Sequence, residues 1–445
     1  MLKKHLLFIG LFLLGIACSH KEEPQLRETM VTTAEIIAIE TFQTLTNGLR
    51  SSDNTTLESI DSLSNVDPTT PLYLANFSEG GYLLFGKNNQ TANVIGFSEG
   101  GALHFGDSIE ASFLGEIFAQ SQMHLSNWNA HLDLIGDDGP KYDPNRYPKE
   151  FYRREVQPVI TPYEPSCYRY FRQDEPFNRY LLHRGKKGVH IPAGCGPIAI
   201  ATIFSHYKKQ GIAKQQIDWD LLLTKYNTPN ESVYLLHKED EKYRKDYPDE
   251  LSKETPEERS KRHDLIDKLA KMIADISNNA YLIRDTEYTL TTKRLLKAYL
   301  KNTGFKTEEE DYNHRELIGY LQKEKRPVIL FGWSKDSKTG KASNKKEKAA
   351  HYWVVDGYKA RPTNEYKKIC KSPTEIVDWF FNRTYYDYFV HCVWGWGKKR
   401  WEGYFNYEVF NPCKNLSEYD TSLRSSKKQD GDFYNVDIIK VEPKH

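Results

Sequence analysis

Cys195 is the residue whose type and surroundings are best suited to chemistry. It stands in Ala193-Gly-Cys-Gly-Pro197, directly before an almost wholly apolar run that reaches Phe204. Proline suits the first turn of a helix, and the apolar run predicts a helix buried on all sides. The positive end of a helix dipole stabilises a thiolate, which lowers the thiol pKa and creates a nucleophile for acyl transfer. A cysteine beside a buried helix can also be just a small apolar residue, and this segment alone leaves both interpretations open.

A thiolate nucleophile needs a base, and His351 is the candidate. Residues 326–332 and 350–358 are apolar runs of strand length, and His351 begins the second. A histidine at such a position is often only a core or surface residue. His351 follows Cys195 by 156 positions, however, and nucleophile and base are similarly far apart in cysteine peptidases that hold them on opposite walls of a cleft. The pair together predicts Cys–His acyl transfer.

Further segments turn this pattern into a family resemblance. With residues 193–195 and 351–358, the chain resembles the streptopain-type cysteine peptidases of bacteria. The other segments that carry the resemblance are Tyr170-Phe-Arg-Gln173-Asp-Glu-Pro-Phe-Asn178, the strand-like Ile217-Asp-Trp-Asp220, the aromatic turn Trp394-Gly-Trp-Gly397 and the closing strand Gly403-Tyr-Phe405.

The resemblance implies a role for each of four residues. Cys195 would attack the scissile carbonyl, and His351 would take and later return the proton. Gln173 and the Cys195 backbone N–H would stabilise the oxyanion, and Trp394 would shield the pair. The implied activity is that of a cysteine endopeptidase, with proteins or peptides as substrates.

The resemblance also implies the fold class and a built-in inhibitor. We expect an α+β chain whose papain-like catalytic domain combines a helical part with an antiparallel β part. A small α+β pro-domain would precede it, since residues 71–98 resemble the pro-domain of the family. This pro-domain would act as an intramolecular inhibitor that blocks the cleft of a latent zymogen until it is cleaved away.

Val393 departs from the family pattern. The family has asparagine immediately before the aromatic turn, where it orients the histidine, and a valine side chain cannot form that hydrogen bond. Either His391, Asp387 or a backbone carbonyl replaces it, or His351 is less well oriented and catalysis is slower. Asp356 is expected to be a turn carboxylate rather than a catalytic partner.

The N-terminus predicts export and a lipid anchor. Residues 1–17 form a signal peptide, because the apolar run 6–16 is too short to span a membrane. The small residues before Cys18 resemble a bacterial lipoprotein signal, in which Cys18 is lipidated, and the alternative is a plain secretory peptide. The charged residues 19–23 resemble a tether that sends lipoproteins to the cell surface. We therefore expect a lipoprotein of the outer membrane or cell surface, with a periplasm-facing position as the alternative.

The remaining chain divides into three parts. Residues 18–135 form the pro-domain-like α+β region, helical from residue 27 to about 65 and then built of hairpin strands with Gly-Gly turns in the repeats 77–86 and 97–106. Residues 136–165 read as an exposed linker, a favoured site for the activating cleavage. Residues 166–445 are the peptidase domain, interrupted by a charged helical insertion near 231–262.

Composition excludes several other classes of protein. The 445 residues carry 62 Lys+Arg against 61 Asp+Glu, which argues against a nucleic-acid partner and against a disordered chain. The sequence contains no metal cluster with credible ligand spacing and no phosphate-binding glycine loop. We therefore expect neither a metal nor another cofactor.

Five cysteines remain after Cys18, and their pairing is left open. An oxidising compartment favours disulfides, so an odd number predicts at least one free thiol. Apart from Cys195, the four could form two bridges or stay buried and reduced: Cys167, Cys370, Cys392 and Cys413.

Two rival functions remain on the sequence alone. One is a lipid-anchored binding or inhibitory protein built on a catalytically weak or inactive peptidase fold, for which Val393 would be a sign. The other keeps the thiol chemistry but transfers the acyl group to an amine or hydrolyses an amide other than a peptide bond.

Overall fold

A computed structural model describes most of the chain from α1 to the C-terminal strand. The described residues are 23–46, 55–63, 72–88, 91–103, 149–183, 186–227, 255–281, 283–284, 289–333, 350–371, 376–395, 402–410 and 435–444. The predicted signal peptide 1–17, Cys18 and Cys413 lie outside these residues.

The helices and strands follow one another in mixed order. The helices are α1 (Glu23–Leu45), α3 (Cys195–Tyr207), α4 (Trp219–Lys225), α8 (Pro256–Ala280), α9 (Lys293–Asn302), α10 (His314–Glu324) and the 3-10 helix η2 (Tyr407–Phe410). The strands are β1 (Leu57–Leu63), β2 (Leu72–Phe77), β3 (Tyr82–Asn88), β4 (Thr91–Ser98), β5 (Lys149–Val156), β6 (Ile160–Tyr163), β7 (Ile283–Arg284), β8 (Thr289–Leu290), β9 (Phe305–Asp311), β10 (Val328–Trp333), β11 (His351–Cys370), β12 (Ile376–Val393), β13 (Gly403–Asn406) and β14 (Asn435–Pro443).

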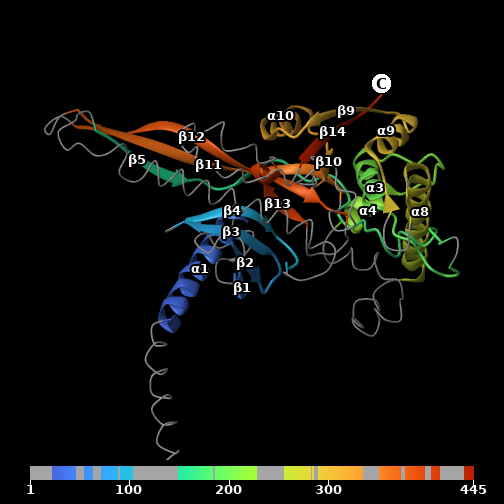
Figure 1. The fold of residues 1–445 in the computed structure, drawn as a ribbon, viewed down its shortest axis with the longest axis horizontal. Helices are drawn as coiled ribbons and strands as arrows, with labels where there is room; N and C mark the ends of the chain where they lie inside the picture. Colours follow the sequence, from blue (N-terminus) through green and yellow to red (C-terminus); the bar gives the residue numbers. More distant parts are fainter. Residues whose placement is uncertain are drawn as a thin grey trace, which may run out of the picture.

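The predicted α+β class is confirmed. Among the described residues, the order β1-β2-β3-β4-β13-β12-β11-β10-β14-β9 forms one sheet, and β5 and β6 join it by pairing with β11. The pairs of this sheet are antiparallel, as in β10 with β11 and β14 with β9. Helices α3, α4, α8 and α9 gather at one end of the molecule, beside the central strands (Figure 1).

The central strands β10 and β11 carry apolar runs on both of their faces, because both faces are covered. In β10, Ile329 packs in the cluster formed with α3 and α8, while the adjacent Val328 packs in a second cluster with α10. Val354 and Val355 of β11 divide between the same two clusters. Successive strand residues point to opposite faces, so this double burial explains the unbroken apolar runs of the sequence.

Helix α3 has the buried character that its sequence predicts. Residues 196–205 are all buried, and the helix packs on both β11 and α8. The helix ends at Tyr207, because Lys208 adopts the left-handed conformation (φ 50°) and caps it.

The charged insertion predicted at 231–262 is described only at its end. Residues 228–254 lie outside the described residues, and from Pro256 the chain forms α8. Thr255 caps this helix, since its side chain accepts from the Glu258 N–H and the Glu258 carboxylate accepts from the Thr255 N–H. The segment 217–220, expected to be strand-like, instead begins α4 behind the N-cap Asp218.

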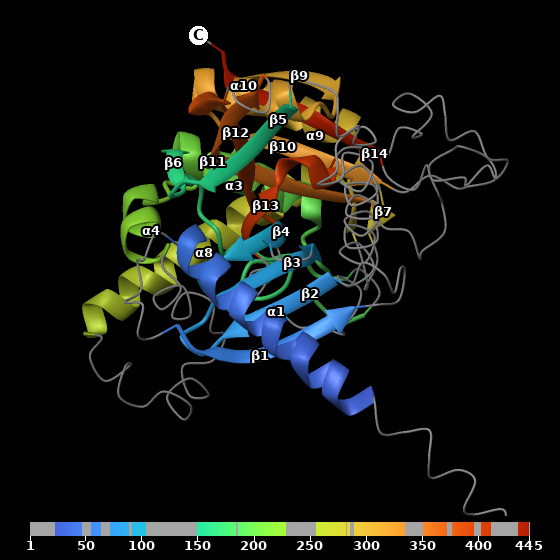
Figure 2. The ribbon, with the colours of Figure 1, turned by 90° about the vertical axis from the view of Figure 1, so that its left-hand side faces the viewer.

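The N-terminal part is a sheet covered by one helix. Helix α1 lies across β1 to β4 (Figure 2), and the ring of Phe42 stacks on that of Phe77 at 3.9 Å. The hairpin expected from the first repeat is present as β2 and β3, whereas the second repeat is described only to residue 103. The Gly81 N–H of the first Gly-Gly turn donates to the Gly101 carbonyl of the second. The helix predicted to reach residue 65 is too long: it ends at Leu45, and residues 57–63 form β1.

The N-terminal sheet continues directly into the peptidase part. In the β4–β13 pair, Phe97 lies opposite Tyr404 and Gly96 opposite Phe405. Glycine is needed here, because a Cβ on Gly96 would lie 2.8 Å from the Phe405 ring and one on Gly403 would overlap the Phe97 carbonyl. The two parts thus form one hydrogen-bonded sheet.

An ion pair reinforces this junction. The ammonium of Lys359 in β11, a buried residue, contacts the carboxylate of Glu99 beyond β4. The same ammonium lies 4.6 Å from the ring centroid of Tyr404.

The linker prediction for residues 136–165 is wrong where the structure describes it. Residues 149–156 form β5, which pairs with residues 363–370 of β11, and residues 160–163 form β6. With β11 and β12, strand β5 extends away from the body of the molecule as an arm (Figure 1). A strand this rich in charge satisfies its backbone by pairing, a long-range contact that its composition does not reveal.

The described cysteines are unpaired. Cys167, Cys195, Cys370 and Cys392 form no disulfide, and Cys167 and Cys392 are fully buried. Of the four cysteines whose pairing the sequence leaves open, Cys167 and Cys392 are therefore buried and reduced, Cys370 is reduced but partly exposed, and Cys413 lies outside the described residues.

The β4–β13 junction yields a stability prediction. The substitution Gly403→Ala forces a Cβ against the Phe97 carbonyl and should lower the free energy of unfolding by about 1–3 kcal/mol. Gly319→Ala is the control, since a Cβ there meets nothing within 4 Å and alanine favours helix α10 by about 0.5–1 kcal/mol. Denaturant unfolding followed by circular dichroism measures both, and equal stabilities for the two variants would contradict the predicted close approach.

Candidate active site

The loop that leads into Cys195 is held by hydrogen bonds to its backbone. The Ala193 N–H donates to the carbonyl of Gln173 (2.8 Å), and the Ala193 carbonyl accepts from the buried hydroxyl of Ser277 in α8 (2.8 Å). One residue earlier, the Pro192 carbonyl accepts from the Thr289 hydroxyl in β8 (2.6 Å). Three segments distant in sequence therefore fix the path of this loop.

Two glycines let the loop approach its neighbours closely. Gly194 is the N-cap of α3 with φ 93°, and a Cβ there would lie 3.0 Å from the side chain of Thr289. A Cβ on Gly196 would lie 2.8 Å from Thr291. L side chains rarely adopt the positive φ of Gly194, and the contact with Thr291 leaves no room for a side chain at Gly196, so both positions require glycine.

Cys195 is the first residue of α3 and is partly exposed. Burial raises the pKa of its thiol above the ordinary value, while the backbone N–H groups of Tyr352, Gly196 and Cys195 itself oppose the rise. The donors at the helix N-terminus are therefore present, but the thiol pKa is raised rather than lowered as expected, because desolvation disfavours the thiolate more strongly.

His351 precedes Tyr352, and the backbone N–H of Tyr352 contacts the thiol of Cys195. The Tyr352 N–H that acts on Cys195 belongs to the residue after His351, so the first residues of α3 and β11 lie side by side. The structure thereby brings together the two residues that the sequence separates.

A backbone carbonyl orients the His351 ring. Its Nε2 lies 3.0 Å from the carbonyl oxygen of Trp394. A carbonyl can only accept, so Nε2 donates, and in the neutral ring the lone pair is on Nδ1. His351 is buried, and burial lowers its pKa to about 4, although the hydrogen bond to Trp394 works in the opposite direction.

The position of the Trp394 carbonyl depends on Gly395. Gly395 has φ 75°, and a Cβ there would lie 2.6 Å from the side chain of Ile198 in α3. The chain after β12 thus passes against the helix that carries Cys195. The Trp394 ring lies 6.4 Å from the His351 ring and 5.3 Å from that of Trp353, which agrees in place with the expected shielding role.

Of the three substitutes considered for the missing asparagine, the structure selects the backbone carbonyl. Val393 itself is buried opposite Val354. His391 is engaged elsewhere, since its Nδ1 lies 2.6 Å from the Asp356 carboxylate. Asp387 pairs with Arg361 on the arm.

Asp356 is a buried anchor, and the expectation of a turn carboxylate is wrong. It lies within the continuous strand β11, and its Oδ2 accepts from the backbone N–H groups of Ser166 (3.0 Å) and Cys167 (2.8 Å). Burial alone would raise the pKa of Asp356, but His391, Arg169 and the Cys167 N–H hold it below its ordinary value. The ionised carboxylate thus ties the start of the peptidase part to β11.

The structure places the residues predicted to act in catalysis near one another. Cys195, His351 and Trp394 converge where α3, β11 and the end of β12 meet. Gln173 is partly buried and is joined to the nucleophile loop through its backbone. Cys18 lies outside the described residues.

Sequence reasoning did not find the residues that support the loop. Ser277 and Thr289 stand in segments without any distinctive pattern, and the Trp394 carbonyl belongs to a residue singled out only for its ring. The glycines around Cys195 were the available signal that neighbouring groups come very close.

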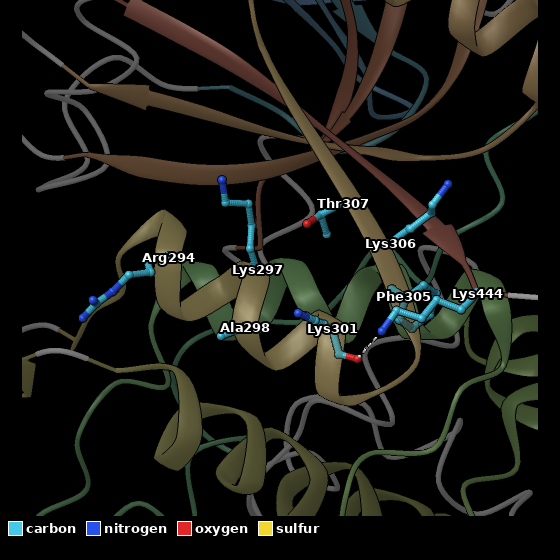
Figure 3. A pocket seen from close by; sticks show the side chains of 8 residues that line it. All are labelled: Arg294, Lys297, Ala298, Lys301, Phe305, Lys306, Thr307 and Lys444. Atoms are coloured by element: carbon cyan, nitrogen blue, oxygen red, sulfur yellow. Dashed lines mark hydrogen bonds between the residues drawn. The ribbon is translucent and has the colours of Figure 1, made fainter.

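In the described ranges, no three His, Cys, Asp or Glu side chains gather in a way that could hold a metal ion. A hollow of about 520 Å³ lies between α9, β9 and Lys444 (Figure 3), where Phe305 stacks on Phe204 near the far end of α3 from Cys195.

Comparisons with known proteins bear on the same residues. The model of the Peptidase C10 family matches residues 171–405, which include Gln173, Cys195, His351 and Trp394. A search of the curated proteins found no match.

Two solved structures from Prevotella intermedia are similar. A prointerpain A fragment has 13% identity over 87% of this chain and 98% of that chain, with a TM-score of 0.43. The active interpain A cysteine protease has 14% identity over 62% of this chain and 94% of that chain, with a TM-score of 0.35.

The state of the thiol and imidazole gives a pH prediction. Above about pH 4 His351 is neutral and lends no positive charge to a thiolate, and the Cys195 pKa is raised. The rate at which iodoacetamide alkylates Cys195 in the uncleaved chain should therefore keep rising into alkaline solution, in proportion to the thiolate fraction.

Peptide-resolved mass spectrometry measures this rate for Cys195 separately from the partly exposed Cys370, which serves as the internal reference. A rate that is already constant between pH 5 and 7 would contradict the neutral pair, because it would require a thiolate held by a protonated His351.

Proposed function

Because the chain belongs to the Peptidase C10 family, we propose that it is an exported, lipid-anchored cysteine endopeptidase made as a latent zymogen. The observation that carries the activity is that the backbone N–H of Tyr352, the residue after His351, contacts the thiol of Cys195 at the N-terminus of α3, while the Trp394 carbonyl orients the His351 ring. A nucleophile, a base and a group that orients the base are the parts that thiol acyl transfer requires.

The proposed reaction proceeds through a thioester. His351 Nδ1 takes the thiol proton as the sulfur of Cys195 attacks the peptide carbonyl. The Cys195 N–H and the Gln173 side chain donate to the resulting oxyanion. Collapse breaks the C–N bond, and the leaving amine takes the proton from His351. Water, deprotonated by His351, then attacks the thioester, releasing the acid and restoring the thiol.

The N-terminal part, residues 23–103 as described, is the proposed inhibitor. Its sheet is hydrogen-bonded to β13, and Glu99 pairs with Lys359 of β11. A raised Cys195 pKa beside a neutral His351 suits a latent form, since little thiolate is available. Activation by cleavage is proposed within residues 136–148, because residues 149–163 are engaged in β5 and β6.

Export and anchoring are proposed on the sequence. Residues 1–17 would be removed as a signal peptide, and Cys18 would carry the lipid that holds the protein at the outer membrane or cell surface. Of the helices that the structure describes, none has the length and apolar character needed to cross a membrane.

The rival binding protein lacks a specific observation in its favour. It rested on Val393, and the Trp394 carbonyl occupies the role that the missing asparagine side chain would have. It is retained as an outcome of the test below.

The test of the proposed function is casein hydrolysis under reducing conditions. The chain from Ser19 should hydrolyse casein after limited trypsin treatment and should be labelled by E-64, whereas Cys195→Ala should show neither activity nor label. Cys370→Ser is the matched control, because its thiol is partly exposed on the arm and should leave hydrolysis unchanged.

Each outcome of this test points to one function. Hydrolysis that survives Cys195→Ala would overturn the assignment of the nucleophile. Labelling of Cys195 without casein hydrolysis, but with release of ammonia or an amine from small amides, would favour the acyl-transfer rival. Neither label nor hydrolysis in a folded chain would favour the binding protein.

The oxyanion role of Gln173 is tested separately. Gln173→Ala should lower kcat by about 10²- to 10³-fold, because one donor to the developing negative charge is lost. Asp174→Ala is the control, since that exposed carboxylate pairs only with Arg172 in the described structure and should not alter kcat. A Gln173→Ala enzyme with unchanged kcat would remove Gln173 from the mechanism.

A further inference from the structure

The arm carries most of the exposed apolar surface that the structure describes. Of the twelve large apolar side chains that are exposed in the described residues, eight lie on β5, β6 or β12. They are Phe151, Tyr152, Val156, Ile160, Trp379, Phe380, Phe381 and Tyr386. The arm of β5, β11 and β12 extends away from the body of the protein (Figure 1), so the other described elements leave its outer end uncovered.

Five of these residues gather at the outer end of the arm. The sheet register places Tyr152 of β5 and Phe380 of β12 on either side of Lys367 in β11. We call the five residues the aromatic tip: Phe151, Tyr152, Trp379, Phe380 and Phe381.

Both faces of the tip are bare. Residues 378–381 of β12 are exposed one after another, as are residues 151–153 of β5. Because successive strand residues point to opposite faces, consecutive exposure means that neither face packs on another part of the described protein. A surface that docks one folded partner would leave only one face bare.

The tip is surrounded by cations. Arg153, Lys367, Lys368 and Lys371 lie in the same stretches of β5 and β11 or directly after β11, whereas Asp378 is the one acid among residues 151–153, 366–371 and 378–381. The Arg153 guanidinium lies 5.3 Å from the ring centroid of Tyr366 and 5.6 Å from that of Trp379. The Arg153 guanidinium thus lies over the rings of two aromatic side chains of the arm.

We propose that the aromatic tip of the arm inserts into the headgroup region of a bilayer that contains anionic lipid. Aromatic side chains with a polar or polarisable ring favour the membrane interface, and neighbouring Lys and Arg are attracted to anionic headgroups. A thin arm with two exposed apolar faces can be surrounded by the headgroup region of a bilayer. Its excess of positive charge favours a bilayer that contains anionic lipid. The contact is separate from Cys195 and does not depend on the proposed peptidase activity.

The experiment is sedimentation of the chain from Ser19 with vesicles. This chain keeps every described residue and lacks Cys18, so a covalent lipid cannot contribute. It should sediment with vesicles of phosphatidylcholine containing about one third phosphatidylglycerol, and added salt should weaken the binding because it screens the cations. Vesicles of pure phosphatidylcholine should bind it about tenfold less.

Two variants of the arm test the two components. Trp379→Ser with Phe380→Ser and Phe381→Ser should lower the partition coefficient about tenfold or more by removing apolar insertion. Lys367→Glu with Lys368→Glu should abolish the preference for anionic vesicles. Circular dichroism and the thermal midpoint establish that each variant is folded.

Matched controls change similar side chains elsewhere. Leu182→Ser with Ile212→Ser removes two exposed apolar residues outside the arm. Lys301→Glu with Lys306→Glu and Lys444→Glu reverses three of the five cations that line the hollow in Figure 3. Both controls should bind anionic vesicles as the unchanged chain does.

Three results would overturn the proposal. The first is no binding of the unchanged chain to anionic vesicles. The second is a loss of binding in either control as large as in the arm variants. The third is a concentration-dependent dimer, seen by analytical ultracentrifugation, that the serine variant of the tip abolishes, because the tip would then be covered by a second copy of this chain.

Discussion

The close approach of the Gly395 backbone to Ile198 ties the end of β12 to the helix that carries Cys195. The Trp394 carbonyl stands one residue before this contact and accepts the hydrogen bond that orients His351. A side chain at Gly395 would push the two elements apart, and the base would then lose its partner. The loop hydrogen bonds from Ser277 and Thr289 serve the same end from the other side, since they hold the backbone just before the nucleophile. The candidate site therefore depends mainly on backbone groups that are held by tight packing.

Desolvation governs the electrostatics of this region. It raises the thiol pKa of Cys195 and lowers that of His351, so the enclosed pair rests in its neutral form. Asp356 stays ionised although it is fully buried, because two backbone N–H groups and His391 surround its carboxylate. The difference lies in the partners: His391 and the positive charge of Arg169 support the Asp356 carboxylate, whereas the thiol of Cys195 has only backbone N–H donors, which do not offset desolvation.

The N-terminal part and the arm both grow out of the central sheet. Strand β13 carries the sheet into β4, and the outer half of β11 carries it into β5, so segments far apart in sequence become neighbours through backbone pairing. At the first extension, the ion pair between Glu99 and Lys359 links the proposed inhibitor to β11, the strand that begins with His351. The second extension, the arm, exposes several apolar side chains close together. Proteins that contact only water rarely expose such a cluster.

The amino-acid sequence by itself determined the helix behind Cys195 and the apolar strands that contain or precede His351, because these follow from local periodicity and from glycine and proline positions. The family resemblance added the identity of the nucleophile and base. Only the tertiary structure decided that the Trp394 carbonyl replaces an asparagine, that residues 149–156 are a strand, and that the thiol pKa is raised. Each of these depends on contacts between distant segments or on exclusion of water, and neither leaves a mark in the local pattern of residues.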